Sequence, residues 1–417
     1  MARGAPVTGG PLPSVCLPHL NSPDIRCPVS SQNRNYLDNA ATSFPKPPAV
    51  SRAVADYNER LGAPAGRGSY PEAIEVAARI AKCRQHAANL LGAEGPGQIV
   101  FTFNGTDGLN IALHGLLNSG DHVVTSVLEH NSVLRPLRDL HDRCGIEVTH
   151  VAADSTGHVN ADDVRRALRP NTKLVALVHA SNVTGAIQPI AEVGRIAHDS
   201  GALFLVDAAQ TAGHVPIELR TLPVDFLACS GHKGLLGPLG TGILYLRAGI
   251  EDQVRSFRQG GTGTRSEDDH QPTSLPEKFE SGNLNVPGLL GFEAALTYLH
   301  ERTVASVTEH ERGLTRQLLE GLTAIPGVRV HGPGSTTDRV GVVSVTADGY
   351  DPQELATILE QGWRIQTRAG LHCAPGAHRA LGTFATGGTV RFSVGPFTTS
   401  DQIMAACDAM RAIVATE

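Results

Sequence analysis

The feature that most constrains this chain is a series of short apolar runs separated by helix-length segments. Two of these segments, 161–170 (ADDVRRALRP) and 190–201 (IAEVGRIAHDSG), have a helical pattern. Most of the runs are continuously apolar, which is typical of strands buried on both faces. The alternation predicts βαβ units and an α/β fold with a mostly parallel, seven-stranded sheet. The runs are 98–103 (QIVFTF), 121–127 (DHVVTSV), 147–153 (EVTHVAA), 173–180 (KLVALVHA), 203–209 (LFLVDAA), 225–230 (DFLACS) and 242–247 (GILYLR).

The pattern changes near residue 290. Residues 290–325 predict two or more helices, and a last helix is expected over about 399–415. Strands are predicted at 328–333 (VRVHGP), 340–347 (VGVVSVTA), 363–368 (WRIQTR) and 389–395 (TVRFSVG). We therefore predict a large domain over 34–290, whose first residues can pack on the other domain, and a smaller α+β domain over 291–417. Residues 1–33 are rich in proline, lack periodicity and predict a flexible extension.

The segment 257–288 (FRQGGTGTRSEDDHQPTSLPEKFESGNLNVPG) lies between these two parts of the chain. Its glycine, proline and charged residues suit a linker. A connection of this length in a compact protein is more typical of an ordered functional loop, which is the interpretation that we prefer.

Composition excludes several classes of function. The net charge is −6, lysine and arginine are dispersed, and aromatic residues make up only 4%, so no nucleic-acid surface is predicted. No apolar run approaches the roughly 20 residues that span a bilayer, and no secretory signal is visible. The seven cysteines are scattered without a C-x-x-C pair, so we predict neither a metal site nor a disulfide framework. We expect a cytoplasmic protein with reduced thiols.

One lysine stands in an unusually tight stretch of sequence. Lys233 lies in 229–242 (CSGHKGLLGPLGTG), a stretch with five glycines and almost no other charge. Asp207 lies at the end of an earlier apolar run; alone, such an aspartate is more often a helix cap or turn former. A lysine and an acid at two strand ends are what pyridoxal phosphate enzymes need, because the lysine binds the aldehyde of the cofactor and the acid keeps its ring nitrogen protonated.

Other residues fit the remaining needs of such a cofactor. The loop Asn104-Gly105-Thr106-Asp107-Gly108 follows a strand and precedes a helix, which suits a phosphate, although a lone glycine loop is a weak signal. Ser230 and His232 add polar groups near Lys233, although His232 could equally be a buried histidine with a structural partner. His130 is predicted in a loop after a strand, where it could stack on a ring and move protons.

With these residues in place, the chain resembles the cysteine desulfurases of the class V aminotransferase group, within the fold-type I pyridoxal phosphate enzymes. The likeness runs from about Tyr36 to the C-terminus, and the RAGLHCA motif is similar to that of the Suf-type branch. The motifs that carry it are YLDNAATSFPKP, GRGSY, EHNSVLRP, SNVTG, VDAAQTAG, SGHKGLLGP, GGTG, FESGNLN and RAGLHCA.

The resemblance implies roles for individual residues. Lys233 matches the lysine that carries pyridoxal 5'-phosphate, Asp207 the partner of its ring nitrogen, and Gln210 the donor to its ring oxygen. His130 matches the stacking histidine. The residues that match phosphate ligands are Thr106, Ser230 and His232, with Asp107 in the same loop. Those that match substrate-binding residues are Asn182 and Arg391, which hold a carboxylate, and Arg368.

Cys373 matches the cysteine that forms a persulfide. Without the motif, a free cysteine is more often a small buried hydrophobe. The glycines around RAGLHCAPG, with Arg368 and His372 beside the thiol, favour an exposed reactive loop instead.

The chain departs from the family at Asn283. Family members usually have threonine after FE-x-G, where it reaches the phosphate of the neighbouring subunit, whereas this chain has asparagine. An amide can still donate a hydrogen bond, and Thr262 in GGTG could compensate. We expect a homodimer, because this loop carries residues directed at phosphate.

The resemblance implies conversion of L-cysteine to L-alanine, with the sulfur held on Cys373 and passed to a sulfur-acceptor protein. A selenocysteine lyase or a pathway-specific carbon–sulfur lyase would use the same residues. A scaffold without turnover that binds the sulfur acceptor is the non-enzyme alternative, and the presence of Lys233, Asp207 and Cys373 argues against it. A dinucleotide-dependent dehydrogenase is excluded, because no G-x-G-x-x-G opens a helix after the first strand.

Overall fold

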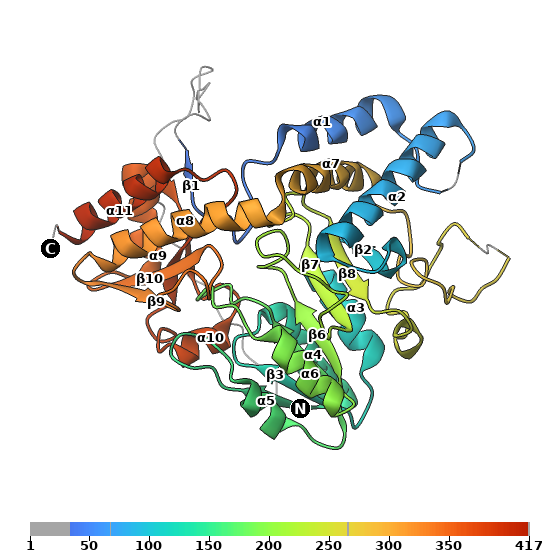
Figure 1. Cartoon of the computed structure of the whole chain (residues 1–417), viewed down its shortest axis with the longest axis horizontal. Helices are drawn as coiled ribbons and strands as arrows, with labels where there is room; N and C mark the ends of the chain where they lie inside the picture. The colour runs from blue at the N-terminus through green and yellow to red at the C-terminus, as the bar shows by residue number, and fades with distance from the viewer. Residues whose placement is uncertain (1–33, 67, 265–266, 416–417) are drawn as a thin grey trace, which may run out of the picture. The chain divides into compact units, whose positions relative to one another are not determined.

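Seven strands form the central sheet of the compact unit Asn35–Glu417 (Figure 1). Along the sheet their order is β2-β8-β7-β6-β5-β3-β4. All neighbouring pairs are parallel except the two that involve β8. The prediction of a mostly parallel, seven-stranded sheet is confirmed. The strands are β2 (Ile99–Thr102), β3 (His122–Ser126), β4 (Glu147–Val151), β5 (Thr172–Val178), β6 (Leu203–Asp207), β7 (Phe226–Ser230) and β8 (Gly242–Leu246).

This computed structural model describes residues 34–415 apart from residues 67 and 265–266. The extension predicted over residues 1–33 lies outside the described residues. No helix in the described part of the chain is both long and apolar enough to cross a membrane.

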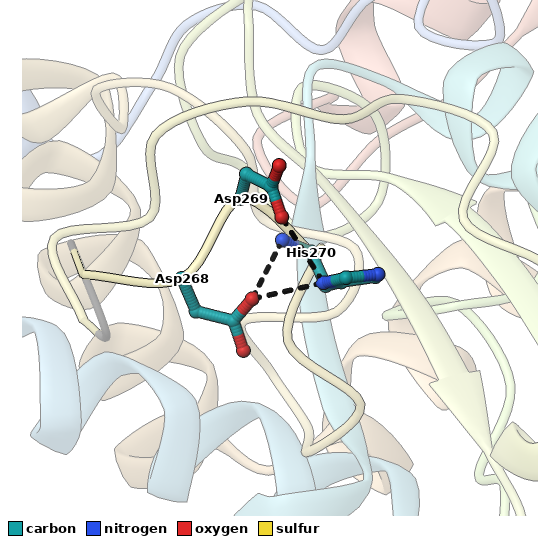
Figure 2. Close-up of side chains that lie close together, drawn as sticks. All are labelled: Asp268, Asp269 and His270. Carbon is teal, nitrogen blue, oxygen red and sulfur yellow. Dashed lines mark hydrogen bonds and ion pairs between the residues drawn. The ribbon is translucent and has the colours of Figure 1, made fainter.

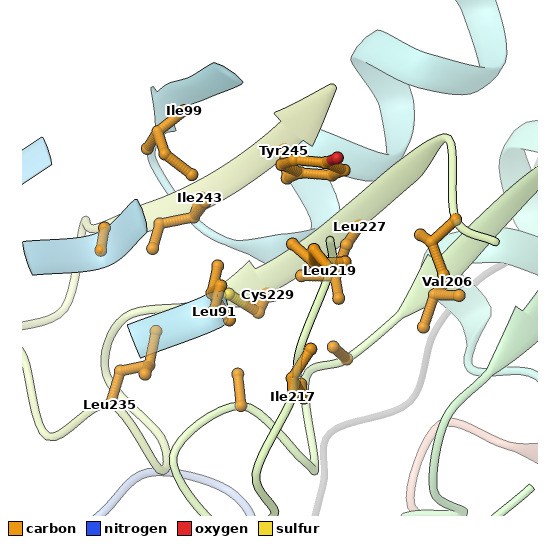
Figure 3. Close-up of a cluster of buried hydrophobic side chains, with 14 of the residues drawn as sticks. Leu91, Ile99, Val206, Ile217, Leu219, Leu227, Cys229, Leu235, Ile243 and Tyr245 are labelled. Carbon is orange, nitrogen blue, oxygen red and sulfur yellow. The ribbon is translucent and has the colours of Figure 1, made fainter. Parts of the chain in front are cut away.

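Both faces of the central sheet are covered, which explains the continuous apolar runs. In β5, Leu174 and Ala176 belong to one buried cluster, whereas Val175 and Leu177 belong to another. All four are at most 2% exposed. Figure 3 shows part of the second cluster. Successive side chains of a strand point to opposite faces, so a strand with both faces buried is apolar along most of its length.

Helices follow most strands of the sheet and return the chain to the next strand. They are α3 (Gly105–Leu116), α4 (Asn131–Cys144), α5 (Ala161–Ala167) and α6 (Ile190–Asp199). The helices expected within 161–170 and 190–201 are thus confirmed as α5 and α6. A further group brings N-terminal helices onto a later one: α1 (Pro48–Asp56) and α2 (Pro71–Leu91) both pack against α7 (Val286–Arg302). Single-turn elements are η2 (Tyr57–Leu61), η3 (Pro96–Gln98) and η4 (Glu251–Gln253).

A second, antiparallel sheet has the order β12-β13-β10-β9. Its four strands are β9 (Val328–His331), β10 (Val342–Ala347), β12 (Arg368–Gly370) and β13 (Thr389–Ser393). The helices of this region are α8 (Val304–Thr323), α9 (Pro352–Trp363), α10 (Pro375–Ala380) and α11 (Ser400–Val414). Helix α8 packs against β9, β10 and α11 (Figure 1). The N-terminal end of the described chain joins this region, because β1 (Asn35–Tyr36) pairs in parallel with β11 (Ile365–Gln366).

The structure divides the segment 363–368, which the sequence predicts as one strand. Trp363 ends α9, Arg364 follows in the left-handed conformation with φ 55°, and only then do β11 and β12 form. The left-handed cap ends the helix and turns the chain into the short strands.

The predicted domain boundary at residue 290 falls inside α7, and the division into 34–290 and 291–417 stays a prediction. The loop before α7 is anchored to the central sheet. Glu280 forms two hydrogen bonds with Arg84, at 2.6 and 2.9 Å, and accepts a third from the backbone N–H of Phe101 at 2.6 Å. These buried contacts agree with an ordered loop.

A buried ion pair joins the loop after β6 to α8. The Nδ1 atom of His214 lies 2.9 Å from Oε2 of Glu311, and both side chains are less than 10% exposed. The hydroxyl of Thr308 donates to the backbone oxygen of His214 at 2.7 Å. Burial lowers the pKa of His214, but the charge of Glu311 and its hydrogen bond outweigh burial and raise that pKa overall. The Glu311 carboxylate therefore favours the charged form of His214.

The variant Glu311→Gln tests this pair. Because it leaves a buried histidine charge without compensation, we expect the free energy of unfolding to fall by about 3 kcal/mol. The loss should be greatest below pH 6.5, the ordinary value for an unfolded histidine, and should shrink as the pH rises through the raised pKa of His214. Urea unfolding between pH 6 and 9 measures it.

The matched control is Asp139→Asn, which breaks an exposed pair with Arg143. Its effect on the free energy of unfolding should be small, because water and salt screen an exposed ion pair. A Glu311→Gln effect that is equally small, or that does not change with pH, would contradict a charged buried pair.

Candidate active site

The carboxyl ends of three neighbouring strands bring the polar residues together. In the register of the sheet, Val178 at the end of β5 lies beside Asp207 at the end of β6, and Asp207 pairs with Ala228 of β7, two residues before Ser230. Lys233 follows three residues after the end of β7. Ligands of open α/β sheets bind at this edge.

Glycines allow the loop around Lys233 to pack closely on its neighbours. A Cβ at Gly234 would collide with the backbone oxygen of Ala212 and the ring of His214, and a Cβ at Gly231 would collide with Thr241. The unusual glycine content of 229–242 therefore reflects close packing at the loop that presents Lys233.

A cavity at this edge collects half of the residues that the sequence predicts. Those that line it are Thr106, His130, Asn182, Asp207, Gln210, Ser230 and Lys233. The others lie outside its lining: Asp107, His232, Thr262, Asn283, Arg368, Arg391 and Cys373. Thr262 and Asn283 instead line a second cavity together with Arg84 and Glu280.

Burial controls the charges at the bottom of the cavity. Burial lowers the pKa of Lys233 to about 8; the Asp207 carboxylate opposes this shift, and Arg391 and Arg368 add to it. Burial raises the pKa of Asp207, against a hydrogen bond from the backbone N–H of Ala209 and the charge of Lys233. A neutral fraction of the amine is therefore present near pH 7–8, and a neutral amine is a nucleophile and a base.

His130 is fixed in orientation at the start of α4. Its Nδ1 accepts a hydrogen bond from the backbone N–H of Ser132 at 3.1 Å, so the ring proton lies on Nε2. Burial and the neighbouring Lys233 lower the pKa of His130 to about 4, so the ring is neutral. The Ser132 hydroxyl lies 2.8 Å from Nδ1 and 2.7 Å from the Thr106 hydroxyl, which links the histidine to the first turn of α3.

The N-terminus of α3 presents backbone and hydroxyl groups to the same cavity. Asn104 caps the helix by accepting from Asp107 N–H at 2.9 Å, and the N–H of Gly105 donates to the Ser230 hydroxyl at 3.1 Å. The Asp107 carboxylate accepts from Phe103 N–H at 2.9 Å and pairs with Arg258 at 3.2 Å. Such a helix N-terminus with hydroxyls beside it suits an anion.

Cys373 lies in a strained turn after β12. It has φ 59° and the preceding His372 has φ 50°, a conformation that residues other than glycine rarely adopt. Two hydrogen bonds hold the turn: the Asn182 side-chain amide donates to His372 O at 2.6 Å, and Asn131 N–H donates to Cys373 O at 2.8 Å. The Arg368 guanidinium lies 3.7 Å from the thiol sulfur.

Arg391 is buried beneath this turn on β13, at 1% exposure. It pairs with Asp38 at 2.8 Å and donates to the backbone oxygen of Asn182 at 3.2 Å. Its Nε is buried without a hydrogen-bond partner among the described residues. Strand pairing places Arg368 opposite Arg391. The structure thus brings Asn182, Arg368, Arg391 and Cys373 together at one end of the second sheet.

Some site residues are missed by the sequence reasoning. Ser132 lies two residues after His130, which caps α4 and accepts from the backbone N–H of Ser132. This spacing between a helix cap and its backbone partner is a signal that could have identified Ser132. Asp38 lies in a motif that is quoted above, but nothing in the sequence pairs it with Arg391, 353 residues away. Gln210, predicted to face a ring oxygen, lines the cavity and donates to Ala40 O at 3.1 Å.

A cluster of possible metal ligands lies elsewhere. Asp268, Asp269 and His270 have ligand atoms within 4.8 Å of one another (Figure 2). All three are exposed, and His270 Nδ1 lies 3.0 and 3.1 Å from the two carboxylates. The cluster shares no residue with the lining of the cavity of Lys233.

A lysine with a lowered pKa beside a buried aspartate, at the carboxyl edge of a mostly parallel sheet, is typical of α/β enzymes that use an aldehyde cofactor. The comparisons agree. Residues 35–405 match the aminotransferase class-V family. The chain is 37% identical to a probable cysteine desulfurase of Methanothermobacter thermautotrophicus, over 88% of this chain and 92% of that protein. The chain belongs to the aminotransferase class-V family.

Solved structures support the same assignment. The apo structure of the cysteine desulfurase of Thermococcus onnurineus NA1 superposes with a TM-score of 0.87 at 33% identity, covering 93% of this chain and 96% of that one. The cysteine desulfurase CsdA of Escherichia coli, in an S-sulfonic acid form, gives 0.84 at 29% identity with the same two coverages. The α/β fold of class V aminotransferases is therefore confirmed.

The charge state of Lys233 can be measured directly. In the protein without cofactor, competitive acetylation followed by peptide mass spectrometry should give Lys233 a midpoint near pH 8. In Asp207→Asn the midpoint should fall, because the carboxylate that favours the charged amine is gone. Lys173, at the opposite end of β5, serves as the internal reference for the reagent. A midpoint that rises in Asp207→Asn would show that the two groups do not face each other.

Proposed function

We propose that the protein is a pyridoxal-phosphate-dependent cysteine desulfurase, which converts L-cysteine to L-alanine and holds the sulfur as a persulfide on Cys373. The observation that carries the proposal is one cavity lined by both Lys233 and Asp207, with the arginine-contacted Cys373 close enough to affect the charge of Lys233. The relatives' names point to the same reaction.

The residues present fit pyridoxal 5'-phosphate. The hydroxyls of Thr106 and Ser230 at the N-terminus of α3 would hold the phosphate. His232 Nδ1 is buried without a hydrogen-bond partner among the described residues, as expected of a group that awaits a ligand. Asp207 would face the ring nitrogen, and the neutral ring of His130 would stack on the cofactor. When bound, the cofactor supplies an electron-accepting ring for the pair of electrons left at the substrate Cα.

The side chains of the chain then bind the substrate and move its proton. The Arg391 guanidinium would bind the substrate carboxylate through its free Nε and a neighbouring nitrogen, as a planar fork. The neutral fraction of Lys233 would take the Cα proton, which its pKa of about 8 allows near neutral pH. The side chain of Asn182 donates to His372 O and thereby holds the turn of Cys373. Asn182 would thus couple the position of the bound substrate to the position of the thiol.

The sulfur-transfer step balances without a further oxidant. The Cys373 thiolate attacks the substrate sulfur, so an S–S bond forms while the Cβ–S bond breaks. The electron pair of that bond stays with Cβ, which takes up one proton to become the methyl group of alanine, and Cα regains the proton that Lys233 removed. The Arg368 guanidinium donates toward the reacting sulfur of Cys373 at 3.7 Å. The outer persulfide sulfur then passes to an acceptor protein. The RAGLHCA sequence supports placing the enzyme in the Suf-type branch.

The variant Cys373→Ala tests the proposal. Wild-type protein loaded with cofactor should form alanine from L-cysteine and gain one sulfur atom on Cys373 by mass. Cys373→Ala should lose the added sulfur and most alanine formation, because no thiolate accepts the sulfur. Cys144→Ala, which removes another partly exposed thiol, should keep both. Undiminished alanine formation by Cys373→Ala with a reductant present would contradict the role of this cysteine.

We also propose that the enzyme is a homodimer with sites completed across the interface. Large apolar side chains are exposed near the loop that carries Asn283: Phe103 is 48%, Leu239 is 68% and Phe257 is 50% exposed. Phe103, Gly240, Arg258 and Asn283 line one cavity, which places these side chains in one region. An exposed apolar region of this kind is typical of a protein interface. Thr262 and Asn283 do not line the Lys233 cavity of their own chain. In the dimer they would contribute to the Lys233 cavity of the second copy.

The variant Leu239→Glu tests the dimer. A buried charge at an interface is costly, so light scattering should show a shift from dimer to monomer. Met404→Glu on α11, where the side chain is 53% exposed, is the matched control and should remain a dimer. Wild-type protein that is an active monomer would contradict the proposal.

We propose the cytoplasm as the site of action. The five cysteines among the described residues are all free thiols, which suits a reducing compartment.

A further inference from the structure

Lys46 makes an unusual contact with the peptide unit that leads into Lys233. Its Nζ donates to the backbone oxygen of His232 at 2.7 Å and to the Ser43 hydroxyl at 2.6 Å. The two lysines are 187 residues apart in sequence, and Lys46 comes just before α1. The His232 oxygen belongs to the same planar peptide unit as the N–H of Lys233, so its position fixes the backbone of Lys233.

The contact of Lys46 is part of a larger cluster of donors. The same oxygen lies within reach of Ser43 N–H at 3.0 Å, the Thr42 hydroxyl at 3.1 Å and the Ser43 hydroxyl at 3.2 Å. A carbonyl oxygen has two lone pairs, so these donors exceed what an ordinary peptide group requires. The segment 42–46 therefore directs several hydrogen-bond donors at the His232 oxygen.

The charged amine of Lys46 is not held by an ion pair. No carboxylate lies within ion-pair distance of its Nζ among the residues that the structure describes. Burial lowers the pKa of Lys46 to about 8, so most of the amine stays charged at neutral pH. A charged donor makes a stronger hydrogen bond than a neutral one, and partial burial strengthens it further.

On the other side, the loop holds Lys233 through its own hydrogen bonds. Leu236 N–H donates to Lys233 O at 2.8 Å, and Gly237 N–H donates to Gly231 O at 2.7 Å. Gly231 N–H also donates to Thr241 O at 2.8 Å, which anchors the start of the loop to the central sheet. The contact of the His232 oxygen with segment 42–46 adds an anchor directly at the peptide unit of Lys233.

We propose that Lys46 is a positioning residue, which clamps the His232–Lys233 peptide unit and thereby aims the Lys233 amine into the cavity. The proposal rests on the proposed function for its effect on catalysis, but the clamp itself is a property of the chain alone. The hydrogen-bond partners of the Lys46 amine, Ser43 and His232, do not line the cavity, so its effect passes through the backbone of Lys233.

Two readouts test the clamp in Lys46→Met, which keeps the length of the side chain and removes its charge and donors. The first is hydrogen exchange of the protein without cofactor, in peptides that cover 231–238. The second is the rate at which pyridoxal phosphate, trapped by borohydride reduction, appears on Lys233 by mass. We expect about tenfold faster exchange and about tenfold slower labelling, the size of one charge-assisted hydrogen bond. Lys46→Arg should come within about threefold of wild type.

The matched control is Lys173→Met, since Lys173 also donates to a neutral oxygen, that of Gln253 at 3.0 Å, but at the far end of β5. It should leave both readouts unchanged. If Lys46→Met does not fold, Thr42→Val removes one neutral donor to the same oxygen and should give a smaller change in the same direction.

The outcomes separate the two proposals. Unchanged exchange in 231–238, with Lys233 labelled at the wild-type rate, would overturn the clamp. A wild-type chain that never takes pyridoxal phosphate on Lys233 would overturn the proposed function, and the exchange readout would then decide the clamp alone.

Discussion

The arrangement of the candidate site depends on burying one amine, that of Lys233, so that it is partly neutral. Burial lowers the pKa of Lys233 to about 8, while the buried Asp207 beside it prevents a larger fall. Both positions exist only because parallel strands end at one edge: Asp207 is the last residue of β6, and Lys233 follows β7. A sheet with both faces covered supplies the burial, and the glycine-rich turn supplies the close packing.

Contacts between distant parts of the chain then fix the groups around this amine. Asp38 from the segment 36–46 pairs with Arg391 of the second sheet, and Lys46 from the same segment donates to the peptide oxygen before Lys233. On another side, His214 beside Gly234 pairs with Glu311 of α8. Each is a charged contact in a buried or partly buried place, where losing one partner is costly. The segment 36–46 therefore does more than begin the fold, because it joins both sheets at the site.

The strands, and the half of the predicted residues that line the candidate cavity, could be predicted from the sequence because their signals are local. Strands with both faces buried have continuous apolar runs, and Lys233, Asp207 and His130 lie in short motifs at strand ends. The missed features are not local: no pattern links Lys46 to the His232 oxygen or Asp38 to Arg391. The split of 363–368 was missed for a different reason, since a left-handed Arg364 is set by how α9 ends and not by the apolar pattern.

The strained turn at Cys373 needs support from the central sheet. Two successive non-glycine residues in the left-handed region cost on the order of 1–3 kcal/mol each, so the turn persists only if other contacts hold it. Those contacts are made by Asn131 at the start of α4 and Asn182 after β5, and both bind backbone oxygens. Because both bonds are made to backbone oxygens, the proposed sulfur transfer on the thiol would leave the turn in place. The same sheet edge that places Lys233 thus also holds Cys373, and this shared support fixes the position of the amine relative to the thiol.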